Sequence, residues 1–364
     1  MNYDWLYLYC FIFACGLTST LALTPIFQLL AVKFDFMDRP KGEAHKAHGK
    51  ATPLLGGAAI FTAISLCLGF GFLMIYLRKI PHITSLLTEY TDGALHVAPR
   101  MWALLFCAFL AMLLGLVDDR YVLKAHTKFL GQFIIAVIAV FCGKTQLSLF
   151  CPIPAISIAA TIFWYMLLMN AINFFDNMDG LAIGTITIAM VLFAVVAILD
   201  GQVFVALLAA LTAGACAGFW FYNHHPATIF MGDSGSHLLG FMAAAMSLLL
   251  SFFRLDQSLS RFPILIPLFI LAVPIFDTLM VVLIRTRNRK PFWIGDHNHI
   301  SHRFVKMGLS RKRAVDLVHL IALGIGLGAF PVMWGSFQTA AIVVSQAFLL
   351  LAIVSIMQFS LAEK

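Results

Sequence analysis

The sequence is a succession of long apolar runs, many of them close to the ~20 residues that an α-helix needs to cross a bilayer. Hydrophobic residues make up 61% of the 364 residues and charged residues only 11%, against roughly a quarter charged in soluble domains. Eleven runs can be delimited, at residues 7–32, 54–77, 101–117, 129–142, 156–172, 181–199, 203–222, 238–253, 262–284, 314–334 and 339–359. We therefore expect an all-α, polytopic integral membrane protein with about 11 transmembrane helices, or 10 if the short fourth run does not cross.

One membrane domain is expected over residues 1–364, because no segment between the runs is large enough to own a soluble core. The first run lacks a positively charged start and an obvious cleavage site, which favours a retained helix over a signal peptide. The seven cysteines have no spacing typical of a disulfide framework or a metal site. They are interpreted as small apolar side chains.

Lysine and arginine residues predict the orientation of these helices. The segment after the first run, residues 33–53, contains five of them, whereas residues 1–6 contain none. The positive-inside rule then places that segment in the cytoplasm and the N-terminus outside, and with eleven spans the C-terminus is inside. The net charge of +7 is attributed to this orientation and to anionic lipid, and no nucleic acid partner is expected.

Four short polar loops contain most of the residues suited to chemistry. They are residues 118–120, 173–180, 231–236 and 297–303, and each adjoins an apolar run. Carboxylates near a bilayer core cost free energy, so a chain made mostly of hydrocarbon has no structural reason to keep them there. Under the predicted orientation all four loops lie on the cytoplasmic side, which indicates an active site at that face.

The first loop begins with the pair Asp118-Asp119. Two adjacent carboxylates bind a cation, pair with Lys or Arg, or hold one raised pKa by mutual repulsion. The alternative is an interfacial helix end at which Arg120 pairs with an aspartate.

The second loop repeats Asn and Asp every three residues, at Asn170, Asn173, Asp176 and Asp179. If the preceding helix continues through them, their side chains form a stripe on one face. Amide and carboxylate oxygens suit a hard divalent cation with phosphate. The alternative, a helix cap followed by a turn at Asp179-Gly180, explains only one of the four residues.

The third loop reads Gly-Asp-Ser-Gly-Ser at residues 232–236. Its likeness to the nucleophile box of chymotrypsin-like proteases is set aside, because nothing in the chain indicates a β-barrel. Asp233 between glycines with exposed backbone N–H groups fits a metal–diphosphate cradle. A plain interhelical turn capped by Asp233 or Ser234 is the alternative.

The fourth loop contains His297, His299, His302 and Arg303. Three histidines can hold zinc, but the spacing lacks a supporting carboxylate other than Asp296. Phosphate recognition by imidazole and guanidinium groups is favoured over zinc, with an ordinary solvated basic loop as the alternative.

Taken together, these residues resemble the polyprenyl-phosphate N-acetylhexosamine-1-phosphate transferases, over about residues 38–308. The resemblance implies ten or eleven membrane helices with a cytoplasmic active site. The positions that match the family's motifs are Lys46, His48, residues 53–57, Asp118, Asp119, Lys128, Asn173, Asp176, Asp179, Asp233, Pro274, Asp277 and, in the His loop, His299, Ser301 and His302.

Three positions depart from the family's usual pattern. Val122 stands where many members carry a third acidic residue, Asn177 replaces a usual Gly, and Ser301 replaces a usual His. Duties assigned to that third acid or to the middle histidine are therefore not carried over to this chain.

The family's reaction is transfer of N-acetylhexosamine 1-phosphate, here expected to be N-acetylglucosamine 1-phosphate, from a UDP-sugar to undecaprenyl phosphate. UMP is released, magnesium is required with manganese as a substitute, and the product initiates a cell-envelope polysaccharide. The resemblance implies Asp233 and Asn173 as metal ligands. The expected catalytic residues are Asp118, Asp119 and His302, and the expected substrate-binding residues are Lys46, His48, Lys128, Asp176, Asp179, Ser234, His299 and Arg303. The resemblance further implies a multi-pass protein of the bacterial inner membrane, and relatives suggest a homodimer.

A phosphate monoester has a second pKa of about 6 and is mostly ionised at neutral pH, so its deprotonation contributes little. We therefore expect Asp118 and Asp119 to position the attacking phosphate, with general-base action secondary. Two alternatives stay open. One is the phospho-N-acetylmuramoyl-pentapeptide transferase of peptidoglycan synthesis, although the His loop looks more like the N-acetylglucosamine branch. The other is a membrane transporter or lipid flippase, for which the spans hold few ionisable residues, Asp277 and His319 being the exceptions.

Overall fold

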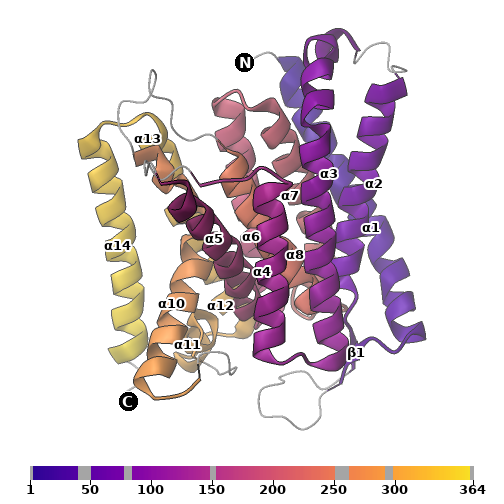
Figure 1. Ribbon diagram of the computed structural model, residues 1–364. Coiled ribbons are helices and arrows are strands. Elements are labelled where there is room, and N and C mark those ends of the chain that lie inside the picture. Colours follow the sequence, from indigo (N-terminus) through magenta and orange to yellow (C-terminus); the bar gives the residue numbers. More distant parts are fainter. Residues whose placement is uncertain are drawn as a thin grey trace.

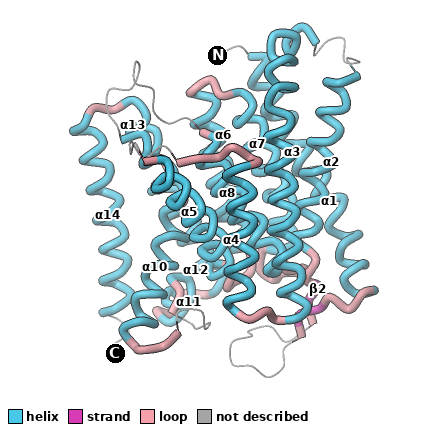
Figure 2. Tube along the Cα trace, in the orientation of Figure 1, coloured by secondary structure: helices cyan, strands magenta, loops and turns pink. Residues whose placement is uncertain are grey.

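The computed structural model describes residues 3–39, 51–77, 84–147, 153–250, 262–291 and 298–360. These residues are almost entirely helical, as Figure 2 shows by the predominance of cyan. The strands found among them are β1 (Met37–Asp38) and β2 (Thr52–Pro53), which pair antiparallel. The expected all-α class is confirmed, with this two-residue ribbon as a minor addition.

The helices follow one another along the chain. Their bounds are α1 (Tyr3–Lys33), α2 (Gly56–Leu77), α3 (Thr84–Tyr121), α4 (Ala125–Phe141), α5 (Pro154–Phe175), α6 (Leu181–Leu199), α7 (Val203–Asn223), α8 (Gly232–Leu249), the 3-10 turn η1 (Phe262–Leu265), α9 (Ile266–Ile270), α10 (Ala272–Arg287), α11 (Ile300–Lys306), α12 (Arg311–Gly326), α13 (Ala329–Trp334) and α14 (Phe337–Ser360).

Within the described part of the chain, eight helical segments are long and apolar enough to cross a membrane, or nine if one bent pair counts as a span. The protein is thus a multi-pass membrane protein. Two of the expected runs, residues 129–142 and 238–253, fall in α4 and α8, which have 17 and 18 residues. Both helices carry polar side chains at one end, so their crossing of the membrane, and the total of about 11 spans, stay predictions.

The ninth expected run is broken rather than straight. Its two parts, Phe262–Ile270 and Ala272–Arg287, meet at an angle of 74°. Pro274 lies two residues into the second part and has no N–H to donate to the carbonyl of Ile270, so the helix cannot continue through Leu271. The break directs α10 toward the end of the bundle at which α11 lies (Figure 1).

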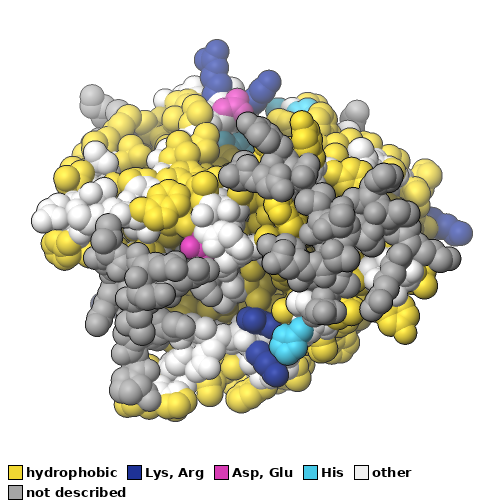
Figure 3. All heavy atoms as spheres, turned by 90° about the horizontal axis from the view of Figure 1, so that it is seen from above, with side chains coloured by type: hydrophobic (Ala, Val, Ile, Leu, Met, Phe, Trp, Pro, Cys, Tyr) yellow, Lys and Arg dark blue, Asp and Glu magenta, His cyan; other side chains and the backbone are white. Residues whose placement is uncertain are grey.

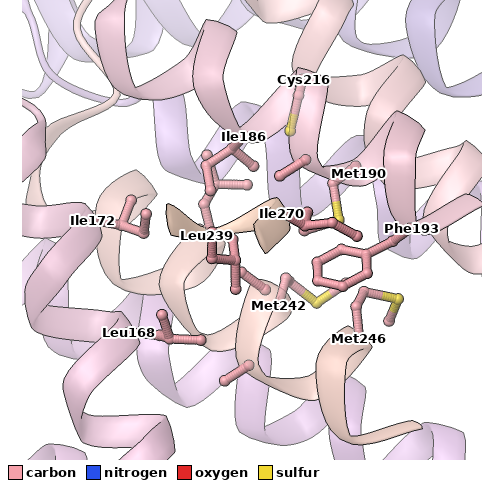
Figure 4. Packing of buried hydrophobic residues seen from close by; sticks show 14 of the residues in the cluster. Leu168, Ile172, Ile186, Met190, Phe193, Cys216, Leu239, Met242, Met246 and Ile270 are labelled. Atoms are coloured by element: carbon pink, nitrogen blue, oxygen red, sulfur yellow. The ribbon is translucent and has the colours of Figure 1, made fainter. Parts of the chain in front are cut away.

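The core is centred on α8, most of whose side chains are buried. In Figure 4, Met242 and Met246 of α8 lie with Met190 and Phe193 of α6. Leu168 and Ile172 of α5 approach from the other side, and all of these side chains are buried. A central helix covered on all sides has little freedom to move, which suits an element whose first turn is to carry functional groups.

The outer helices present apolar side chains to the outside of the bundle. In α14 only 11% of the most apolar stretch is buried, and Phe348 and Leu349 lie on the exterior. The two marked ends of the chain lie at opposite ends of the bundle (Figure 1). The end nearer the N-terminus shows mainly hydrophobic side chains among the described residues, with few charged groups (Figure 3). The polar loops are at the other end.

Candidate active site

Four helix ends meet at the end of the bundle that also holds β1 and α11 (Figure 1). There α3 and α5 end, and α4 and α8 begin. The short connection between α3 and α4 keeps their ends together, and the ammonium of Lys128 on α4 contacts residues of the other three helices. Three of the four predicted loops therefore meet in space.

Lys128 is the centre of this cluster. Its Nζ lies 2.7 Å from Asp118 Oδ2 and donates to Asp233 Oδ2 at 2.8 Å and to Asn173 Oδ1 at 3.1 Å. Asn173 in turn donates from Nδ2 to Asp233 Oδ1 at 2.8 Å and to Ser236 Oγ at 3.0 Å. The Asp233 side chain is 33% exposed against 8% for Asp118. The Asp233 carboxylate thus has more exposed surface than that of Asp118.

Asp119 faces away from Lys128 and holds the first turn of α8. Its carboxylate accepts hydrogen bonds from the backbone N–H groups of Asp233 at 2.8 Å and Ser234 at 3.1 Å. Gly232 has a φ of +67°, and a Cβ there would lie 2.6 Å from Asp119 Oδ2. Only glycine permits this approach, and a carboxylate at a helix N-terminus is favoured by the helix dipole.

Two side chains near this turn have partners that the sequence did not indicate. The Ser234 hydroxyl is buried and donates to the carbonyl of Met231, so its side chain faces its own helix rather than open space. Arg120 does not pair with the aspartates beside it. It donates to the carbonyl of Asp35 and lies over the ring of Phe36, which ties the loop after α1 to the end of α3.

Helix α5 ends at Phe175, so the expected continuous stripe of Asn and Asp is divided. Asn173 is helical and Asp176 is the C-cap, whereas Asp179 lies in the turn before α6. Asp179 accepts hydrogen bonds from His225 Nδ1 and from the N–H of Ala227, and thereby holds the segment that leads into α8. Burial, and the charges of Asp233 and Asp179, raise the pKa of Asp176 to about 8.

The His loop is organised by Asp277 of α10, which is 2% exposed. Its carboxylate accepts from the N–H of Ile300 at 2.6 Å and lies 2.7 Å from His299 Nδ1. Asp277 thereby caps α11, whose N-cap residue is His299. His302 and Arg303 follow in the first turn of α11. His297, like Lys46 and His48, lies outside the described residues.

Sequence reasoning missed two residues of the site region, Gln132 and His237. Both are fully buried and connect α4 with α8 one helical turn away from Lys128 and Asp233. A glutamine and a histidine inside otherwise apolar runs are the signal that could have identified them. The two exceptions noted in the spans both have structural partners: Asp277 caps α11, and His319 bonds to the carbonyl of Leu181.

The donor chemistry at Lys128 fits a hard divalent cation. Two carboxylates and one amide oxygen already surround a positive charge there, and such oxygens are the ligands that Mg²⁺ takes together with water and phosphate. No group of three or more His, Cys, Asp or Glu side chains is placed to hold a metal in the described part of the chain. A zinc site in the His loop gains no support from the described residues.

The chain is similar in sequence to known proteins. The model of glycosyl transferase family 4 matches residues 101–251, which include α4, α5 and the first turn of α8. A Bacillus subtilis protein named as a probable undecaprenyl-phosphate N-acetylglucosaminyl 1-phosphate transferase is 33% identical, over 87% of this chain and 83% of its own. A decaprenyl-phosphate N-acetylglucosaminephosphotransferase of Mycolicibacterium smegmatis is 31% identical, over 94% and 87%. A phospho-N-acetylmuramoyl-pentapeptide-transferase of Clostridium botulinum is 27% identical, over 85% and 91%.

Proposed function

Since the chain belongs to glycosyl transferase family 4, the polyprenyl-phosphate N-acetylhexosamine-1-phosphate transferases, we propose that it transfers N-acetylglucosamine 1-phosphate from its UDP-linked donor to undecaprenyl phosphate. The observation that carries the proposal is the meeting of Asp118, Lys128, Asn173 and Asp233 from four helices at one point. The Bacillus subtilis and Mycolicibacterium smegmatis relatives, which are 33% and 31% identical over most of the chain, carry names of N-acetylglucosamine phosphate transferases. The lipid product would initiate a cell-envelope polysaccharide in a bacterial inner membrane.

The reaction needs no proton transfer to balance. An oxygen of the lipid phosphate bonds to the β-phosphorus of the UDP-sugar, and the bond from that phosphorus to the oxygen retained by UMP breaks. Charge is conserved, because a dianionic phosphate attacks and dianionic UMP leaves. Positioning and charge neutralisation are therefore the main tasks of the protein.

Charge neutralisation is the difficulty that the site presents. Asp118, Asp119 and Asp233 carry three formal negative charges, and Lys128 supplies one positive charge among them. The excess of negative charge would repel the two anionic substrates. A divalent cation held by Asp233 and Asn173 would neutralise it and stabilise charge on the diphosphate oxygens. We therefore propose dependence on Mg²⁺, with Mn²⁺ as a substitute.

The chain's own groups then have distinct tasks. Lys128 holds the oxygens of Asp118, Asn173 and Asp233 together and offers its ammonium to phosphate. Asp119 fixes the turn that presents Asp233, so its role is that of a positioning residue. His302 and Arg303 on α11 would contribute positive charge to the nucleotide, together with Lys46 and His48 of the first loop. Because α14 ends at the same end of the bundle as this site (Figure 1) and the positive-inside rule predicts a cytoplasmic C-terminus, we propose that the site faces the cytoplasm.

The test is release of UMP by purified protein given undecaprenyl phosphate, Mg²⁺ and a panel of UDP-sugars. We expect release with UDP-N-acetylglucosamine, little with UDP-N-acetylmuramoyl-pentapeptide, and none in EDTA. Asp233→Asn should abolish release, whereas Asp200→Asn, the same change at the C-cap of α6, should not. Release with the muramoyl-pentapeptide donor alone would move the protein to the other branch, and no release with any donor would favour a transporter.

A further inference from the structure

A second layer of polar side chains lies directly beneath the Lys128 cluster. Each of α4, α5 and α8 contributes one residue to the cluster and another residue one helical turn farther from the helix end, on the same face. The pairs are Lys128 with Gln132, Asn173 with Asn170, and Asp233 with His237. We call Gln132, Asn170 and His237 the deep layer.

The hydrogen bonds of the deep layer fix the orientation of every member. The carbonyl of Asp233 only accepts, so His237 carries its proton on Nδ1 and donates it to that carbonyl at 2.8 Å. His237 Nε2 is then an acceptor, and Gln132 Nε2 donates to it at 3.0 Å. This sets the Gln132 amide so that its Oε1 accepts from Asn170 Nδ2 at 2.6 Å. Gln132 Nε2 also donates to Asn170 Oδ1 at 3.3 Å, so these two amides pair in both directions, and the layer is a neutral chain that ends on the backbone of Asp233.

The deep layer places polar groups where they are costly. Gln132 and His237 are fully buried within apolar helices, and a buried polar group without a hydrogen-bond partner destabilises the fold. Hydrocarbon side chains would pack between these helices without leaving any polar group unpaired. Polar contacts also serve simply as adhesive between membrane helices. What distinguishes this layer is that one end of it contacts the backbone of Asp233, whose carboxylate meets Lys128 and Asn173 in the cluster.

Asp233 is held from all directions as a result. Its carbonyl accepts from His237 and from Ser236 Oγ, its N–H donates to Asp119, and its carboxylate meets Lys128 and Asn173. We propose that Gln132, Asn170 and His237 are positioning residues that hold Asp233, Asn173 and Lys128 in the geometry required for phosphosugar transfer. This inference rests on the proposed function and adds to it a buried support that touches no substrate.

A matched pair of variants tests this role against simple adhesion. Gln132→Met keeps the length of the side chain and breaks the deep layer at its centre. Ser247→Ala removes the hydrogen bond that Trp164 Nε1 donates to Ser247 Oγ at 2.8 Å, which joins α5 and α8 away from the site. If polar contacts only hold the helices together, both changes should lower thermal stability, and their effects on kcat should be the same.

We expect Gln132→Met to lower kcat roughly 10–100-fold, the usual effect of losing a partner that orients metal ligands, with little change in KM for either substrate. Binding of Mn²⁺ alone, followed by electron paramagnetic resonance without substrates, should weaken in parallel. Ser247→Ala should keep both kcat and Mn²⁺ affinity. Asn170→Ala, which removes the far end of the chain, is the second variant and should reproduce the kcat effect if Gln132→Met does not fold.

Equal kcat for the wild type and the deep-layer variants, or an equal loss in Ser247→Ala, would overturn the positioning role. Failure of the wild type to release UMP would instead overturn the proposed function. The Mn²⁺ measurement then decides the positioning role by itself, because equal Mn²⁺ affinities in the wild type and Gln132→Met contradict it.

Discussion

The hydroxyl of Ser301 donates a hydrogen bond of 2.6 Å to the side-chain oxygen of Asn177, across 124 residues of sequence. These are two of the three positions at which the chain departs from the usual pattern of its family. Asn177 also donates to the carbonyl of Phe174 at the end of α5. The pair therefore joins the end of α5 to the first turn of α11, and so links the aspartate cluster to the His loop.

We predict that Asn177 and Ser301 are energetically coupled. Asn177→Ala and Ser301→Ala should each lower kcat/KM. The kcat/KM of the double variant should be no lower than that of the less active single variant. The coupling free energy should be about 0.5–3 kcal/mol, as for residues in direct contact. Asn177→Asp keeps the acceptor oxygen for Ser301 but loses the N–H that donates to Phe174, so it should retain more activity than Asn177→Ala. Strict additivity of the two single effects would show that the hydrogen bond has no functional part.

Asp118→Asn should lower kcat at every pH. Asp118 Oδ2 contacts Lys128 and its Oδ1 accepts from the N–H of Leu123, which is the arrangement of a group that positions its neighbours. A pH profile of UMP release from pH 6 to 9 is the measurement. Since the acceptor phosphate ionises with a pKa of about 6, full recovery of the variant at pH 9 would mean that proton removal was the main role of Asp118.

Val122→Gly should stabilise the protein. Val122 follows α3 with a φ of +49° and is 84% exposed, so a β-branched side chain occupies the left-handed region without packing in return. That conformation costs roughly 1–2 kcal/mol for residues other than glycine, part of which is offset by the extra flexibility of glycine when unfolded. We expect the free energy of unfolding to rise by about 0.5–1 kcal/mol, as measured by thermal unfolding in detergent. Val122→Ile, which keeps the strain, should give no gain.

Asp176→Asn should change how stability depends on pH. The pKa of Asp176 is raised to about 8 in the folded protein, against an ordinary value of about 4 when unfolded. Unfolding between these values releases a proton, so this carboxyl lowers stability as pH rises from about 4 to 8. In EDTA, the melting temperature of the variant should rise relative to that of the wild type as the pH is raised from 5 to 8. A constant difference over that range would contradict the raised pKa.

Much of the site could be predicted from residue types and their positions in the sequence. Asp118, Asn173 and Asp233 stand at the ends of apolar runs, where only function explains polar oxygens, and the structure brings them together at Lys128. The break at Leu271, the end of α5 at Phe175 and the burial of Ser234 could not be read in this way. The break and the Ser234 hydrogen bond involve residues close in sequence, Pro274 and Met231, but which of several local arrangements forms is decided by the packing of the surrounding helices.

A helical membrane protein with polar oxygens at its helix ends could be predicted from the sequence, because the length and hydropathy of a run are local properties. The separate roles of those oxygens became visible in the folded protein. Asp119 reaches across 114 residues to cap α8, and Gln132 reaches across 105 residues to orient His237. Such contacts depend on how helices pack in three dimensions, since the pairing of a buried donor with its acceptor is settled only when both are removed from water.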